Sequence, residues 1–147
     1  MSHIIRPQMP AILMRGFEAF AANDAVAIGE VFEPHAFLVS HVDPKLLNLV
    51  GVPRGKPVRS RGNLEIARFF AHEFSVLQIN YTDVHSDVRV GREYAATCDF
   101  EAKILSTGQT VAARCAGIYT LSRTGRKVES GRTVCKFITP GWDFRFN

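Results

Sequence analysis

The 147-residue sequence has no apolar run long enough to cross a bilayer, and its N-terminus lacks the long apolar segment of a secretory signal. We therefore expect a cytoplasmic protein without membrane contacts. No internal repeat and no linker-like stretch divides the chain. With 46% hydrophobic and 22% charged residues, the composition is typical of a globular protein. Residues 1–147 are predicted to form a single domain with its own core.

Cysteine is scarce, and metal-ligand spacing is missing. Cys98, Cys115 and Cys135 are odd in number, include no CxxC pair and lie in strand-like segments, which favours buried free thiols. The five histidines show no HxxxH spacing. We predict no metal site and no cofactor.

The sequence has a formal net charge of +4 but no aromatic residues interleaved with its basic groups. These groups lie in or beside Gly/Pro turns and comprise Arg54, Lys56, Arg59, Arg61 and Arg123, Arg126, Lys127, Arg132. Nucleic-acid binding needs stacking residues or a reading helix, so we expect solvated loops and no nucleic-acid partner. An anionic ligand or an acidic partner is the second interpretation.

Apolar residues at helical spacing predict helices over 10–22, 25–32 and 63–77. Pro10 suits a first turn, Asp24 and Asn63 are expected caps, and Pro34 ends the second helix. The predicted buried face of the third helix comprises Leu64, Ala67, Phe70, Ala71 and Phe74. A first strand is expected over 36–42, and an irregular connection over 44–63 has the length of a lid or binding loop.

The second half of the chain is predicted to form an antiparallel meander of four strands, 79–90, 94–104, 110–122 and 128–138. Alternation assigns an inner face to Tyr94, Ala96, Cys98, Phe100, Ala102 and Ile104, and to Val111, Ala113, Cys115, Gly117, Tyr119 and Leu121. Pairing Leu105 with Thr110 would set Cys98 opposite Gly117 and Phe100 opposite Cys115. The face of segment 79–90 depends on its turn: a bulge at Gly91 turns Val84, Val88 and Val90 inward. A regular turn would instead bury Asp83, His85 and Asp87, which we consider the less favourable register.

The segment FEAFAANDAVAIGEVFEPHAFLV (17–39), followed by RGNLEIARFFAHEF (61–74), resembles the NTF2-like superfamily in its SnoaL-like and ketosteroid-isomerase-like branch. The resemblance covers most of the chain and consists of hydrophobic spacing around the Asn23-Asp24 break. It implies an α+β cone in which N-terminal helices pack on a curved antiparallel sheet and enclose an apolar pocket. The family includes isomerases, polyketide cyclases, epoxide hydrolases, dehydratases and non-catalytic binding modules, and many members are homodimers.

The resemblance also implies where catalytic groups of the isomerases would fall. Their base aspartate corresponds to Ser40, and their oxyanion tyrosine corresponds to Gly16. The isomerase set is therefore missing, and the Asp-Arg-Asp arrangement of the epoxide hydrolases is not visible either. We expect a small-molecule pocket protein, either an enzyme acting on an apolar or polycyclic substrate by acid–base catalysis or a non-catalytic binding or dimerisation module.

The stretch VSHVDPK (39–45) ends the first predicted strand and supplies a candidate catalytic pair. His41 is a possible general base near neutral pH, and Asp43, two residues on, would share its face and orient it. The other interpretation, which we favour, is that Asp43 forms a turn before Pro44 while His41 is exposed.

A small apolar ligand and a homodimer complete the expectations. The predicted pocket-lining residues are Phe17, Phe20, Phe70, Phe74, Tyr94, Cys98, Tyr119 and Trp142. The dimer is expected to form through the outer face of the sheet, where Ala112, Ala116 and Ile118 lie opposite the Cys115 face.

Overall fold

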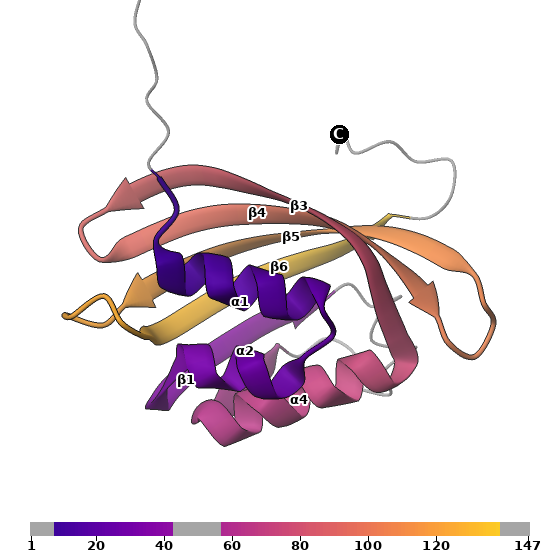
Figure 1. Cartoon of the computed structure of the whole chain (residues 1–147), viewed down its shortest axis with the longest axis horizontal. Helices are drawn as coiled ribbons and strands as arrows, with labels where there is room; N and C mark the ends of the chain where they lie inside the picture. The colour runs from indigo at the N-terminus through magenta and orange to yellow at the C-terminus, as the bar shows by residue number, and fades with distance from the viewer. Residues whose placement is uncertain (1–7, 43–56, 139–147) are drawn as a thin grey trace, which may run out of the picture.

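Three helices lie on one side of a curved six-stranded sheet in the computed structural model, which describes residues 8–42 and 57–138 (Figure 1). The helices are α1 (Ala11–Ala21), α2 (Ala25–Val31) and α4 (Asn63–Val76). The strands are β1 (Phe32–Val42), β2 (Val58–Arg61), β3 (Leu77–Val90), β4 (Glu93–Ile104), β5 (Thr110–Leu121) and β6 (Val128–Ile138). The predicted α+β architecture, with N-terminal helices on a curved sheet, is confirmed.

The sheet has the strand order β2-β1-β6-β5-β4-β3, so the predicted meander of β3 to β6 is present. The structure adds two features to it. β1 pairs in parallel with β6, which sets Ser40 opposite Thr133. β2, inside the segment predicted to be irregular, pairs antiparallel with β1. Within the described residues, no helix is long and apolar enough to cross a membrane.

The helix starts follow local chemistry, with one correction. The Asp24 side chain accepts a hydrogen bond from the Ala27 amide at 3.0 Å and caps α2, as predicted. The residue before α4 is Gly62 rather than Asn63, which is itself helical. The buried face of α4 is also rotated from the predicted one, because Ile66 is fully buried while Leu64 is 70% exposed and Ala71 is exposed.

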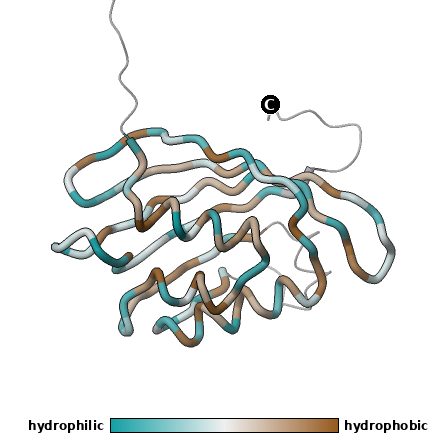
Figure 2. Tube along the Cα trace, in the orientation of Figure 1, coloured by the Kyte–Doolittle hydropathy of each residue, from teal (hydrophilic) through white to brown (hydrophobic). Residues whose placement is uncertain are grey.

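The inner faces of β4 and β5 are those predicted from alternation, but their register is shifted by two residues. Cys98 pairs with Cys115, not with Gly117, and Lys103 pairs with Thr110. The cause is a longer turn, in which the Gly108 amide bonds the Ile104 carbonyl. A shift of two residues leaves every side chain on its predicted face. Hydrophobic residues accordingly recur along the strands as well as the helices (Figure 2).

Two bulges decide the face of β3, and each of the predicted registers is wrong in part. Val84 pairs with Cys98 on the inner face. A register shift between Ser86 and Val88 then turns Val88 outward, where it is 56% exposed, and Val90 is 70% exposed. The alternative, with Asp83, His85 and Asp87 inside, fails because the first and last are exposed and the His85 side chain keeps 40% of its surface.

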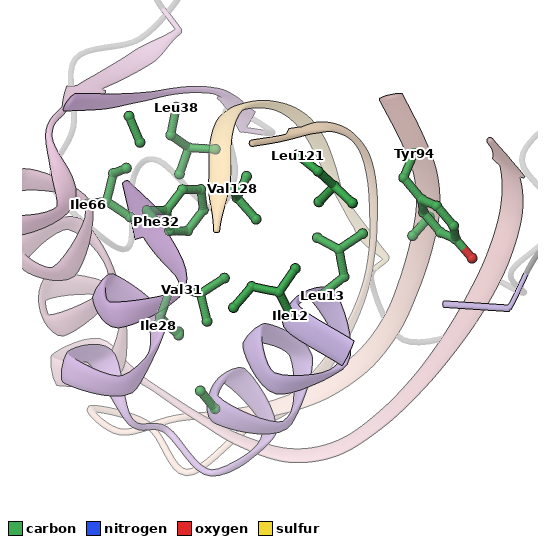
Figure 3. Close-up of a cluster of buried hydrophobic side chains, with 13 residues drawn as sticks. Ile12, Leu13, Ile28, Val31, Phe32, Leu38, Ile66, Tyr94, Leu121 and Val128 are labelled. Carbon is green, nitrogen blue, oxygen red and sulfur yellow. The ribbon is translucent and has the colours of Figure 1, made fainter. Parts of the chain in front are cut away.

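The core consists of two clusters of buried side chains. One, drawn in Figure 3, joins α1, α2 and α4 to β1, to the start of β4 and to the hairpin ends of β5 and β6. Its labelled members include Leu13, Val31, Leu38 and Val128. The second cluster lies under β3 to β6, and Phe17, Phe20 and Phe74 of the helices pack against both.

Candidate functional site

A cavity of about 100 Å³ lies where the two core clusters meet, between the helices and the inner face of the sheet. As formed by the described residues, it is partly open rather than fully enclosed. Its size is of the order of the ~150 Å³ apolar cavity that holds a benzene molecule. The wall is almost wholly apolar, so its few polar groups determine what chemistry it can support.

Glu73 is the one acidic residue in the described wall of this cavity. Burial of its carboxyl group raises the pKa from 4.5 to about 7, and burial is the only cause of the shift. A carboxyl with such a pKa is close to half-ionised at neutral pH, which is the condition for giving or taking a proton. Sequence reasoning missed Glu73, although it follows Phe69 and Phe70 by one helical turn and so shares their apolar face.

Close packing of α4 on α2 directs Glu73 inward. A Cβ atom at Gly29 of α2 would lie 2.9 Å from the Ala67 Cβ atom of α4, so only glycine allows the two helices to approach this closely. Ile66, next to this contact, is fully buried. This anchoring places Phe70 and Glu73, one and two turns further along α4, in the cavity wall.

Tyr119 of β5 supplies a hydroxyl group to the same wall. The Tyr119 ring lies back over its own strand and occupies the space beside Gly117. A Cβ atom at Gly117 would be only 2.5 Å from the Tyr119 hydroxyl. The Phe17 ring meets it edge-on at a centroid distance of 6.1 Å. Burial, followed by the neighbouring Cys115, raises the pKa of Tyr119 well above its usual value. The hydroxyl is therefore a protonated hydrogen-bond donor at neutral pH.

The three cysteines form a row across adjacent strands on the cavity side. Cys98 pairs with Cys115, and Cys115 pairs with Cys135. Burial raises the pKa of Cys98 to about 12, and a hydrogen bond with Cys115, followed by burial, raises the pKa of Cys135. Cys98 and Cys135 are thus weak nucleophiles at neutral pH. All three are free, and in the described ranges no group of three or more His, Cys, Asp or Glu side chains could hold a metal ion.

The structure brings together part of the predicted pocket. Phe17, Phe20, Phe70, Cys98 and Tyr119 lie in the cavity wall.

Two other predicted residues lie behind or beside the wall rather than in it. Phe74 packs behind Phe20 and Phe70, at centroid distances of 5.8 and 6.2 Å. Tyr94 is fully buried at one end of the first cluster (Figure 3), and its hydroxyl bonds with the Ser86 hydroxyl. Trp142 and Asp43 lie outside the described residues.

His41 is exposed and does not line the cavity. It pairs with Val134, an exposed residue on the outer face of β6, whereas its neighbour Ser40 is buried in the cavity wall. Successive strand residues point to opposite faces, so a strand that turns Ser40 inward turns His41 outward. The catalytic hypothesis for His41 therefore gains no support from its position.

Comparison with known proteins gives a likeness in structure only. No family model matches the chain, and no curated protein matches it in sequence. A hypothetical protein with a ketosteroid isomerase-like fold from Catenulispora acidiphila, in complex with trimethylamine, has a TM-score of 0.67 at 13% identity, covering 86% of this chain and 85% of that one. A protein of the SnoaL-like polyketide cyclase type from Mesorhizobium loti has a TM-score of 0.59 at 16% identity, covering 86% and 98%. An NTF2-like protein from Burkholderia xenovorans has a TM-score of 0.62 at 17% identity, covering 85% and 86%.

The chain has the NTF2-like fold. Within that fold, the position that the resemblance assigns to the isomerase base holds Ser40, whose hydroxyl accepts a hydrogen bond from the Thr133 hydroxyl at 3.0 Å. The position of the oxyanion tyrosine holds Gly16, which lines the cavity. The acidic group in the described wall of this cavity comes instead from α4, as Glu73.

Proposed function

We propose that this protein binds a small apolar molecule in the cavity and that Glu73 exchanges a proton with it, as a general acid–base group of an enzyme. The observation that carries the proposal is a carboxyl group with a pKa of about 7 in an otherwise apolar wall. A base of this pKa is ionised in a large fraction of molecules at neutral pH and still binds a proton strongly.

Three hydroxyl groups support the proposal, because they are suited to orient a ligand. Tyr119 is a protonated donor, and the Ser40–Thr133 pair offers further donor and acceptor capacity. Pockets for small molecules commonly combine an apolar wall with a few such polar groups.

The size of the cavity favours a ligand with one ring or a compact branched group over the polycyclic substrate expected from the resemblance. Ligands of that scale occur in the fold, since the similar Catenulispora acidiphila protein is a complex with trimethylamine. The larger part of a longer ligand would extend through the open side.

The alternative function is a non-catalytic binding module of the same fold. It uses the same cavity and the same hydroxyl groups, and it differs only in assigning no chemical role to Glu73. Replacing that carboxyl group therefore separates the two functions.

The experiment uses 1,2-benzisoxazole, a small neutral bicyclic compound that opens when a base removes its C3 proton and the N–O bond breaks. We expect the protein to accelerate this reaction by roughly 10²–10⁴-fold over the variant Glu73→Gln. The rate should rise with pH and level off above a pH near 7, because the ionised carboxylate is the base.

A pair of α1 variants serves as the control for binding in the cavity. Gly16→Leu fills the cavity, and its Cβ atom would meet Val31 at an ordinary 3.6 Å, so the fold should tolerate it. Ala21→Leu adds the same side chain at an exposed position of α1. The acid–base proposal fails if Glu73→Gln turns over benzisoxazole as fast as the unmodified protein while Gly16→Leu still blocks the binding of small apolar compounds.

We also propose a homodimer formed through the outer face of the sheet. Ile118 is 53% exposed and Val134 is 44% exposed on this face, where Ala116 pairs with Val134. On this face Asp83 and Glu101 lie on β3 and β4, together with Lys103, whereas Arg59, Arg132 and Lys136 lie on β2 and β6. A two-fold axis near Ala116 would set the carboxylates of β3 and β4 in one copy against the basic residues of β2 and β6 in the other.

A further inference from the structure

The described wall of the cavity carries one acidic side chain and no basic one. Aromatic residues of α1, α4 and the sheet line the same cavity as this carboxyl group: Phe17, Phe20, Phe69, Phe70, Phe100 and Tyr119. The faces of aromatic rings carry negative electrostatic potential, as an ionised carboxylate does. The local field in the cavity therefore attracts cations, although the chain as a whole has a net charge of +4.

We propose that the ligand of this cavity is a small apolar amine, with its protonated nitrogen against the Glu73 carboxylate and its carbon skeleton among the phenylalanine rings. The inference rests on the proposed function, because it names the chemical class of the ligand that the cavity and Glu73 would bind.

An ammonium ion offsets the cost of the desolvated negative charge on Glu73, which a neutral ligand does not. The carboxylate of Glu73 is desolvated, with no charged partner among the causes of its pKa shift. A neutral ring would remove more water from the carboxylate and offer no opposite charge. An anionic ligand would add a like charge at close range, and the described cavity wall has no basic side chain to offset it.

The described wall of the cavity carries four further titratable groups, on β4, β5 and β6. Cys135 of β6, Cys98 of β4 and Tyr119 of β5 have pKa values raised above their usual range, and Cys115 of β5 is the remaining titratable group. The described lining residues of α1, α2 and β1 carry no ionisable side chain. We therefore assign a pH dependence of binding between pH 6 and pH 8 to the Glu73 carboxyl group, and Glu73→Gln tests that assignment.

Ionisation of the Glu73 carboxyl group gives the affinity for an amine a specific pH dependence. The amine binds the ionised carboxylate, and below the Glu73 pKa of about 7 a proton must first leave that group. Affinity for an amine should then fall about tenfold from pH 8 to pH 6, and binding at pH 6 should release close to one proton. A neutral ligand that accepts a hydrogen bond from the protonated acid would show the opposite trend.

The test is isothermal titration calorimetry of the full chain with three compounds of one size: cyclohexylamine, cyclohexanol and cyclohexanecarboxylate. The amine is protonated at both pH 6 and pH 8, so its own ionisation does not contribute. At pH 8, we expect cyclohexylamine to bind about tenfold or more tightly than cyclohexanol, and the carboxylate to bind least. Glu73→Gln should remove the preference for the amine and its pH dependence, and Gly16→Leu should weaken both the amine and the alcohol. Ala21→Leu should bind as the unmodified protein does.

The outcomes separate this inference from the function on which it rests. Equal affinity for amine and alcohol, unchanged in Glu73→Gln, would overturn the amine as ligand while leaving a cavity that binds apolar molecules. Tight amine binding that persists in Gly16→Leu would place the amine at another site and would also overturn the inference. If none of the three compounds binds the unmodified protein and benzisoxazole is not turned over, the proposed function fails together with the inference.

Discussion

Glu73→Gln is expected to stabilise the protein at pH 8 and to have little effect at pH 4. The folded-state pKa of Glu73 is about 7, above the ordinary value of 4.5 that it regains on unfolding. Between these values the unfolded chain binds fewer protons than the folded one, so this group makes stability fall as pH rises through that window. Below pH 4.5 both states are protonated and no cost arises. Above pH 7 the cost is complete, and at ~1.4 kcal/mol per pH unit it amounts to about 3 kcal/mol.

Glutamine keeps the shape of the side chain without its charge, so it removes this cost. We would measure urea unfolding of both proteins at pH 4, 5, 6, 7 and 8 at constant ionic strength. Their difference in unfolding free energy isolates Glu73, because the other titrating groups are common to both. With a urea slope of ~1–3 kcal/mol per molar, the midpoint of the variant should lie about 1 M or more above that of the unmodified protein at pH 8.

Glu18→Gln is the matched control, because Glu18 is an exposed residue of α1. Its difference from the unmodified protein should be small at every pH. A Glu73→Gln difference that does not change with pH would refute the reasoning, since it would mean that burial does not disfavour the ionised carboxyl. A variant less stable than the unmodified protein at pH 8 would refute it as well.

Three further predictions concern other parts of the molecule. Gly117→Ala should displace the Tyr119 ring, because the new Cβ atom would lie 2.5 Å from its hydroxyl; we expect a loss of ~1–3 kcal/mol in urea unfolding and a changed near-ultraviolet circular dichroism spectrum, and an unchanged spectrum would contradict this. Asn23→Ala should lower the free energy of unfolding by about 2–4 kcal/mol. The Asn23 side chain hydrogen-bonds both the amide and the carbonyl of Ile79, at 2.8 and 3.0 Å, and its backbone has a φ of 57°. A loss below ~1 kcal/mol in urea unfolding would show that these hydrogen bonds contribute little to stability. Light scattering should give twice the protomer mass of 16.4 kDa, and Ile118→Lys should return it to that of the protomer; a protein that is already monomeric at micromolar concentration would rule out the dimer.

Alternation of apolar and polar residues predicted which side chains lie inside, but it could not fix how the strands align. The inner faces of β4 and β5 carry the predicted residues, although Cys98 pairs with Cys115 rather than with Gly117. The alternation pattern cannot detect this error in register, because a shift of two residues leaves every side chain on the same face. In β3 the bulge beyond Ser86 changes the face within one strand, so neither uniform register could be right.

The parallel pairing of β1 with β6 was beyond the reach of sequence patterns for a different reason. Hairpin turns predict pairing between strands that are adjacent in sequence. Ser40 of β1 and Thr133 of β6, which pair, are separated by most of the chain, so no turn indicates their pairing. β2, with four residues, is also too short for its alternation to be distinguished from a loop. The structure, rather than the turns, therefore showed that β1 and β2 extend the meander into a six-stranded sheet.

Clustered polar residues at a strand end predict a site at His41 and Asp43, whereas the cavity points to a single acidic residue on an apolar helix face, Glu73. His41 and Asp43 stood out because two ionisable groups lay close in sequence, yet the strand turns His41 away from the cavity. Glu73 was hidden because one acidic residue in a helix is ordinarily solvated. That Glu73 faces the cavity instead of solvent follows only from the rotation of α4 about its axis. That rotation depends on the contact of Gly29 with Ala67.

The stability cost and the amine inference are two consequences of the same buried carboxyl group. A cation that pairs with Glu73 lowers its pKa, so it should return the free energy that ionisation takes from the folded state. Cyclohexylamine at a fixed concentration should therefore raise the urea midpoint more at pH 8 than at pH 6, whereas cyclohexanol should not show that order. In Glu73→Gln the difference between the two pH values should vanish, because no carboxyl remains to ionise. An amine that stabilises the unmodified protein and Glu73→Gln equally at pH 8 would mean that its nitrogen does not contact this carboxyl group.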